Sequence, residues 1–169
     1  PTLQPDPIRT MREVGRRRPK ADESVRGEET EACRGWMWFI WSAVPASLLA
    51  GVTTHITTDV APLPLFWVVP LAAYLLSFVI VFAPGVRPVS WPVFVGMPVA
   101  YAVLLPVLLH GGTASIPIQL VVHLSTFFIT CLVFHGMLAS TRPPAGRLTT
   151  FYLTLAAGGA AGGLFNGIA

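Results

Sequence analysis

Charged residues are scarce in this chain, and acidic residues are absent from most of it. Only 11% of the 169 residues are Asp, Glu, Lys or Arg, whereas a soluble domain usually carries about a quarter. No Asp or Glu follows Asp59, and the only basic residues after it are three arginines. General acid–base catalysis therefore has almost no candidates in this region. No basic face outside the N-terminal tail would attract nucleic acid.

Motifs that would identify an enzyme or a metal site are also missing. The sequence has no phosphate-binding glycine loop after a strand, no nucleophile elbow and no HExxH. Its two cysteines, Cys33 and Cys131, lie just before one apolar run and in the middle of another, so they are expected to stay unpaired. We expect no catalytic residue, no metal and no dedicated cofactor, and a bound lipid or pigment is the ligand class left open.

What the chain does contain is hydrophobic residues, which make up 53% of it. They gather in five apolar segments, each with about the ~20 residues that cross a bilayer core of ~30 Å. Short connectors rich in Pro, Gly and Ser separate these segments, as expected between antiparallel helices. The sequence therefore predicts an all-α membrane domain over residues 36–169 behind a polar, charged tail at 1–35. Its five transmembrane helices are expected at residues 36–57, 65–82, 91–109, 116–138 and 149–169.

The positions of the arginines predict an orientation. With five crossings, the tail lies on the same side of the membrane as the second and fourth connectors, which hold Arg87, Arg142 and Arg147. The first and third connectors have no Lys or Arg. By the positive-inside rule, the N-terminus is predicted in the cytoplasm and the C-terminus in the periplasm.

The tail carries its charge in two blocks. Residues 9–20 are basic and residues 22–31 are acidic, a composition that buries too little apolar surface to fold alone. We therefore expect a partner chain, another membrane protein subunit, to hold the tail. Contact with the chain's own helix ends or with lipid headgroups is the alternative.

Glycine is concentrated in the last apolar segment, which contains LAAGGAAGGLFNG. Small residues four positions apart let two helix backbones approach closely. We predict that this helix packs at the centre of a bundle or at the edge of an interface. The predicted packing residues are Gly158, Gly159, Gly162, Gly163 and Gly167.

The stretch TTHITTD, residues 53–59, forms a polar cluster between two apolar runs. If the first helix continues to residue 59, His55 and Asp59 are one turn apart and able to hydrogen-bond. A buried Asp–His pair can carry protons, so these two residues form a candidate polar site. The alternative is a structural boundary at the outer surface, where the threonines bond to preceding carbonyls and the prolines that follow stop the helix.

Two further histidines lie in the fourth apolar segment. His123 follows Gln119 by one turn, and His135 lies near the predicted cytoplasmic end. Twelve residues apart, the two histidines differ by roughly 120° around a helix, so a metal site using both is not expected. A single histidine can ligate a haem or a chlorophyll magnesium, which makes His123 and His135 secondary candidates for cofactor binding.

Residues 53–82 and 134–169 resemble the membrane-spanning portion of bacterial spermidine-synthase-like fused proteins. The matching positions are Thr57, Thr58 and Asp59, then His135 and Gly136, Arg142 and Pro143, Leu148 to Leu153, and Gly158 to Asn166. Family members often carry Glu where this chain has Met137. The resemblance implies a multi-pass protein of the bacterial inner membrane. The family's aminopropyltransferase-like catalytic domain follows its membrane helices, and this sequence contains none of it.

Three functions are compatible with these features. The first is a non-catalytic integral membrane subunit or fragment that scaffolds a larger membrane complex, for which a photosynthetic or respiratory complex would be a natural host. The second is the membrane module of a spermidine-synthase-like enzyme. The third is a transporter piece, suggested by the prolines inside the helices and by the His55–Asp59 pair. We rank the hypotheses in this order.

Overall fold

The computed structural model describes residues 34–60, 65–83, 85, 91–109 and 115–168. The chain divides into two units, Pro1–Met37 and Trp38–Ala169, and the architecture below is that of the second. The predictions made for the charged tail, including its partner chain, lie outside the described residues, as do Cys33 and Arg87.

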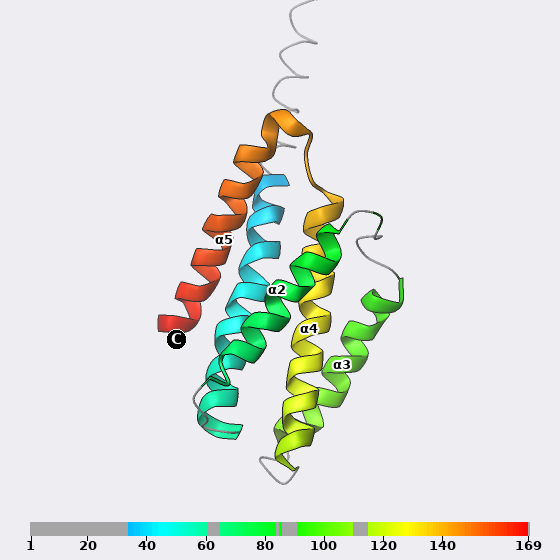
Figure 1. The fold of residues 1–169 in the computed structure, drawn as a ribbon, viewed down its shortest axis with the longest axis vertical. Coiled ribbons are helices and arrows are strands. Elements are labelled where there is room, and N and C mark those ends of the chain that lie inside the picture. The colour runs from blue at the N-terminus through cyan, green and yellow to red at the C-terminus, as the bar shows by residue number, and fades with distance from the viewer. Residues whose placement is uncertain (1–33, 61–64, 84, 86–90, 110–114, 169) are drawn as a thin grey trace, which may run out of the picture. The chain divides into compact units, whose positions relative to one another are not determined.

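The described residues form five α-helices and no strand (Figure 1), which confirms the predicted all-α fold. The first helix covers residues 34–55 and continues as a π-helical turn. The elements after residue 55 are η1 (Ile56–Val60), α2 (Val68–Phe82), α3 (Trp91–Leu109), α4 (Ile116–Ser140), the 3-10 turn η2 (Ala145–Arg147) and α5 (Leu148–Ile168).

The second helix is shorter than predicted. Residues 65–67 form a turn in which Leu65 has a positive φ of 78° and its carbonyl accepts a bond from the Val68 amide at 3.0 Å. The 15 residues of α2 span roughly 22 Å, less than a bilayer core of ~30 Å. Four helices of the described part are long and apolar enough to cross a membrane. Together with the shorter apolar helix α2, they make up the five helices of the predicted all-α membrane fold.

The other predicted boundaries differ from the structure by a few residues. The third helix has the predicted bounds, whereas α4 continues to Ser140 and α5 begins at Leu148. The α-helical part of the first helix ends two residues early, because η1 replaces its last turn. Helix ends commonly differ by such amounts, since the last turn is held by few backbone bonds.

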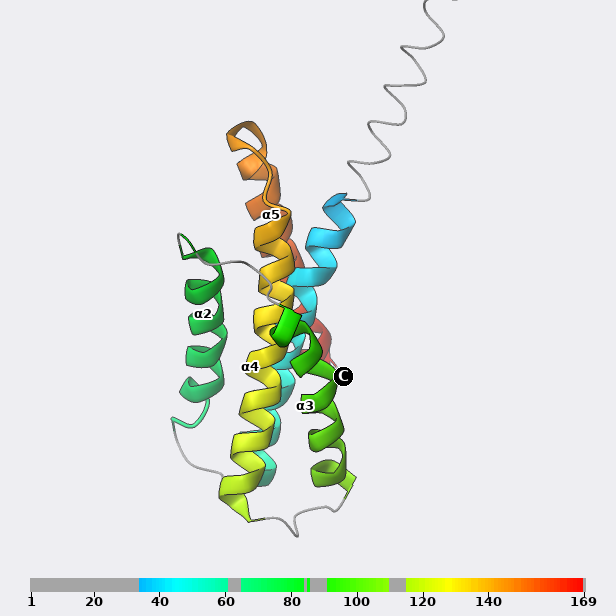
Figure 2. The same cartoon turned by 90° about the vertical axis from the view of Figure 1, so that its right-hand side faces the viewer.

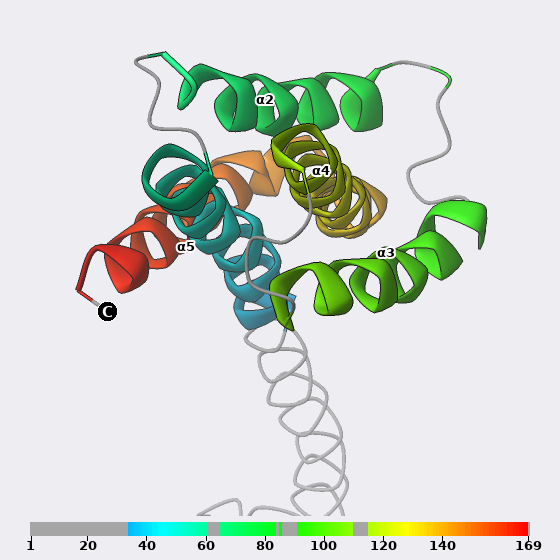
Figure 3. The same cartoon turned by 90° about the horizontal axis from the view of Figure 1, so that it is seen from below.

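The helix α4 lies at the centre of this unit. It packs against α2, α3 and η1, and the view along the bundle shows it surrounded by those helices and the first helix (Figure 3). Nine of its residues are buried, while α3 has none. Figure 2 shows α2 and α3 on opposite sides of α4. A central helix of this kind is expected to carry the polar groups that lipid cannot accommodate.

The interior of the bundle is small and partly polar, and the exterior is apolar. Buried positions include Ser77, Thr126, Thr130 and both described α4 histidines, whereas large hydrophobic side chains such as Leu153 are exposed. Threonine hydroxyls in α4 bond to carbonyls one turn earlier, as Thr126 does to Val122 at 2.8 Å. This distribution is typical of helices in lipid, where close packing and internal hydrogen bonds replace the hydrophobic effect between helices.

Candidate functional site

The stretch TTHITTD closes the first helix with a π-helical turn. The hydroxyls of Thr57 and Thr58 donate to carbonyls one turn earlier, at 2.8 and 2.7 Å, as the sequence predicts for threonines at a helix boundary. π turns are rare and are frequently found at functional sites. The structural boundary and the candidate site therefore occupy the same residues.

The predicted pair His55–Asp59 is present in the structure. The Nδ1 atom of His55 lies 2.8 Å from Oδ2 of Asp59, and the two side chains are 33% and 65% exposed. Since an ionised carboxylate only accepts hydrogen bonds, Nδ1 of His55 carries the hydrogen.

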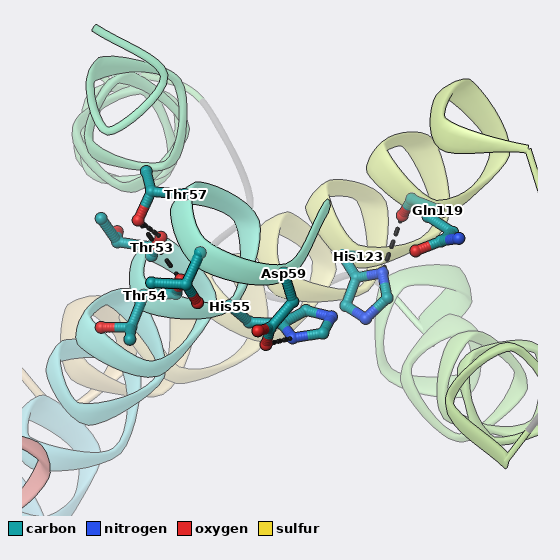
Figure 4. A network of polar contacts seen from close by, with 8 residues as sticks. Thr53, Thr54, His55, Thr57, Asp59, Gln119 and His123 are labelled. Atoms are coloured by element: carbon teal, nitrogen blue, oxygen red, sulfur yellow. Dashed lines mark hydrogen bonds and ion pairs between the residues drawn. The ribbon is translucent and has the colours of Figure 1, made fainter. Parts of the chain in front are cut away.

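The structure adds His123 to this pair. The rings of His55 and His123 have centroids 4.7 Å apart and planes inclined by 37°, and they face one another from the first helix and α4 (Figure 4). Nδ1 of His123 donates to the main-chain carbonyl of Gln119 at 2.7 Å. Nε2 of His123 is buried and has no hydrogen-bond partner among the described residues. Asp59, His55 and His123 thus form one cluster, which we call the imidazole cluster.

Sequence reasoning paired His123 with Gln119 and did not bring it to His55. The two histidines are far apart in the chain, and only the fold places the end of the first helix beside the start of α4. A usable signal was their depth, because one histidine lies near the end of a spanning segment and the other near the start of another. Equal depth alone does not identify neighbours in a five-helix bundle.

The second α4 histidine, His135, lies in a separate aromatic cluster. Its ring stacks on Phe78 with centroids 3.7 Å apart and meets Tyr74 edge-on at 5.0 Å. The hydroxyl of Ser77 donates to the carbonyl of Tyr74 at 2.6 Å, so it accepts from Nδ1 of His135 at 2.8 Å. His135 therefore joins α4 to α2, and its Nε2 is buried without a partner among the described residues.

Neither α4 histidine presents a nitrogen to an open space. A haem or chlorophyll needs an accessible ligand nitrogen, and the Nε2 atoms of His123 and His135 are both buried. No group of three His, Cys, Asp or Glu residues in the described part of the chain is arranged to hold a metal ion. In this conformation the candidate cofactor ligands act as packing and hydrogen-bonding groups.

Two of the predicted packing glycines form the contact between α5 and the first helix. A Cβ atom on Gly158 would overlap the carbonyl oxygen of Phe39, and one on Gly162 would overlap that of Ala43. Gly159 lies beside Ser42, where a Cβ atom would be 3.6 Å from Oγ. A Cβ atom on Gly163 or Gly167, the other two predicted glycines, would meet nothing within 4 Å.

Hydrogen bonds also join the first helix and α5, at two positions along their length. The hydroxyl of Ser42 donates to the carbonyl of Leu155 at 2.7 Å. Further along, the amide of Asn166 donates to the carbonyl of Ser47 at 2.8 Å and also contacts its hydroxyl. Such bonds between membrane helices contribute about 0.6 kcal/mol on average and up to about 1.7 kcal/mol.

A second face of α5, which also carries small residues, borders a groove. A cavity of about 680 Å³ lies between the first helix, α2 and α5. Its wall on α2 is aromatic except for Val79. Its wall on α5 combines three small residues with Tyr152 and Leu155, and Ser42 of the first helix also lines it. We call it the α2–α5 groove, and its main lining residues are Ser42, Tyr74, Phe78, Phe82, Ala156, Gly159 and Ala160.

No family model, no curated protein and no solved structure matches this chain. The resemblance to spermidine-synthase-like membrane portions therefore stays a prediction.

Proposed function

We propose that the chain is a non-catalytic membrane module that accepts a transmembrane helix of another subunit in the α2–α5 groove and so helps to hold a larger membrane complex together. The observation that supports this most is the asymmetry of the groove, in which Ala156, Gly159 and Ala160 face the aromatic residues of α2. Small residues permit close backbone approach by a helix, and aromatic residues supply large contact areas.

The spacing of the glycines extends the groove surface along α5. Gly163 and Gly167 follow Gly159 at intervals of four residues, which places all three on one stripe of the helix. In the described part of the chain nothing approaches Gly163 or Gly167. An incoming helix would therefore find a surface of the same kind that Gly158 and Gly162 already present to the first helix.

The proposal is tested by filling the groove. Ala160 lines it and is exposed, whereas Ala157 is exposed on the same helix and does not line it. We expect Ala160→Leu to release the chain from its complex, seen as a smaller particle mass after extraction in native nanodiscs. Ala157→Leu makes the same chemical change and should leave the mass as in the wild type. Equal masses for both variants would contradict the proposal.

The proposed location is the bacterial inner membrane, with the N-terminus in the cytoplasm and the C-terminus in the periplasm. Support for the orientation comes from Trp38, whose indole nitrogen donates to the hydroxyl of Thr141 at 3.1 Å. The beginning of the first helix therefore lies at the same end of the bundle as Arg142 and Arg147, as the positive-inside rule requires.

Two alternatives follow. The membrane module of a spermidine-synthase-like enzyme is supported by the sequence resemblance alone. A transporter piece is supported by the contact between His55 and His123, because ionisable groups inside a bundle mark proton or ion pathways. In proteoliposomes that show flux, Asp59→Asn should abolish it, and unchanged flux would remove the support for transport.

A further inference from the structure

We infer that the helix received by the α2–α5 groove carries a hydroxyl or carboxamide side chain that hydrogen-bonds to the phenol of Tyr74. This partner chemistry rests on the proposed function, because it describes the helix that occupies the groove. Three features of Tyr74 point to it: its place in the groove wall, a hydroxyl without a hydrogen-bond partner in the described residues, and its depth in the bundle.

The ring of Tyr74 is held by its neighbours on α2 and α4. It meets the ring of Phe78 edge-on with centroids 5.3 Å apart, and it meets the ring of His135 edge-on at 5.0 Å. Tyr74 and Phe78 both line the groove. Because these contacts hold the ring, the phenol occupies a defined position in the groove wall.

The hydroxyl of Tyr74 makes no hydrogen bond within the described part of the chain. In that part, the buried side-chain nitrogen and oxygen atoms without a partner are the Nε2 atoms of His123 and His135. The phenol oxygen is therefore not buried, and the cavity that Tyr74 lines is the α2–α5 groove. A phenol has one hydrogen to donate and lone pairs that accept, so the groove contains an unused hydrogen-bonding group.

The other hydroxyl groups of the groove have partners or lie near an interface. Ser42 donates to the carbonyl of Leu155 at 2.7 Å. Tyr152 is 48% exposed and lies four residues after the first residue of α5, or roughly 6 Å along the axis. Tyrosines near a helix end reach the polar interface, where water and headgroups supply partners. Tyr74 has neither kind of partner in the described structure.

Tyr74 lies near the middle of the membrane. Phe82, the last residue of α2, packs beside Leu138, which is two residues before the end of α4. The ends of α2 and α4 are therefore at a similar depth. Tyr74 is eight residues before Phe82, which corresponds to roughly 12 Å along the axis, close to half of a hydrocarbon core of ~30 Å.

Lipid tails cannot satisfy a phenol at that depth. A hydrocarbon chain has no hydrogen-bonding atom, and an unpaired polar group in it costs free energy. Membrane helices instead bond across their contacts through Ser, Thr, Asn and Gln side chains. These side chains both accept and donate, as the phenol does. The groove therefore fits an apolar helix with one such residue in its central part.

The two walls of the groove also define which face of that helix is polar. Gly159 and Ala160 on the α5 wall permit close approach of a helix backbone. A helix seated on α5 turns its other side toward the α2 wall and Tyr74. The polar side chain is therefore expected on the face opposite the residues that contact α5.

Photo-cross-linking in membranes of the producing organism tests this chemistry. Benzoylphenylalanine is placed at Val79, which lines the groove and is 67% exposed, and expression is kept where the adduct yield is not saturated. Tyr74→Phe removes the hydroxyl and keeps the ring. Loss of one interhelical hydrogen bond weakens association between about threefold and about fifteenfold, so we expect the yield of the cross-linked helix to fall within that range.

Tyr101→Phe is the matched control. It removes a phenol hydroxyl outside the α2–α5 groove, one that is hydrogen-bonded to Thr130 within the chain at 3.3 Å. The yield at Val79 should stay as in the wild type. Equal melting temperatures of Tyr74→Phe and the wild type show that a lower yield does not arise from unfolding.

The peptide attached at Val79 identifies the matching residue. We expect an apolar segment of about 20 residues with Ser, Thr, Asn or Gln near its middle. Replacing that residue with an apolar one should reproduce the loss seen in Tyr74→Phe without altering this chain. Combining the two changes should lower the yield no further, because both remove the same bond.

The outcomes separate this inference from the proposed function. A cross-linked helix with the same yield in the wild type and in Tyr74→Phe would overturn the hydrogen bond and leave the role of the groove in assembly in place. A helix without Ser, Thr, Asn or Gln in its central part would do the same. Lipid adducts alone in the wild type would overturn both.

Discussion

Gly162 in α5 lies directly against the main chain of Ala43 in the first helix, so that any side chain at position 162 would overlap the Ala43 carbonyl oxygen. The neighbouring Gly163 has nothing within 4 Å of the corresponding position. Two adjacent glycines thus have opposite roles in the packing. One is needed for the contact between the two helices, and the other leaves a surface open.

This contrast predicts opposite effects of the same substitution. Gly162→Ala should destabilise the bundle by about 1–3 kcal/mol, since overpacking a close contact forces backbone shifts. Gly163→Ala should change the stability by less than about 0.5 kcal/mol, as expected for an open site. Reversible unfolding of both variants in bicelles measures the difference. Equal losses for the two variants would show that α5 packs differently.

Asn166 and Ser42 should contribute separately to the same contact. Asn166→Leu removes the bond to the Ser47 carbonyl, and Ser42→Ala removes the bond to the Leu155 carbonyl. Each change should cost about 0.6–1.7 kcal/mol, and their effects should add because the two bonds share no partner. The same unfolding measurement on the single and double variants tests this, and a double variant no less stable than either single one would contradict it.

Sequence patterns identified much of the fold because they report local geometry. The spacing of apolar and small residues is enough to predict the helix at 91–109 and the close packing at Gly158 and Gly162. The partner of those glycines, the first helix, is not encoded in that spacing. The short α2 also escaped prediction, because Leu65 to Trp67 are apolar and yet form a turn.

The candidate site was predicted only in its local part. His55 and Asp59 are four residues apart, so helix geometry predicts their bond, and the structure contains it at 2.8 Å. The approach of His123 depends on how α4 sits beside the first helix, which tertiary packing decides. The π turn at Ile56–Val60 has no sequence signature that we could use.

Removing one partner of the Ser77–His135 hydrogen bond should destabilise the bundle more than removing both. Ser77→Ala leaves Nδ1 of His135 buried without its acceptor, which should cost about 1–3 kcal/mol. Replacing both partners with apolar residues, as in Ser77→Ala with His135→Phe, should restore most of that loss. Unfolding free energies of the single and double variants form a double-mutant cycle. A double variant whose loss equals the sum of the single losses would contradict the bond's assigned role.

Site-specific photo-cross-linking tests directly whether the α2–α5 groove receives a transmembrane helix. Benzoylphenylalanine is placed at Ala160, which lines the groove, and at Ala157, which does not, in membranes of the organism that produces the protein. We expect position 160 alone to yield an adduct of one discrete mass, with the attached peptide mapping to an apolar helix of about 20 residues. Lipid adducts only at Ala160, or the same products at both positions, would contradict it.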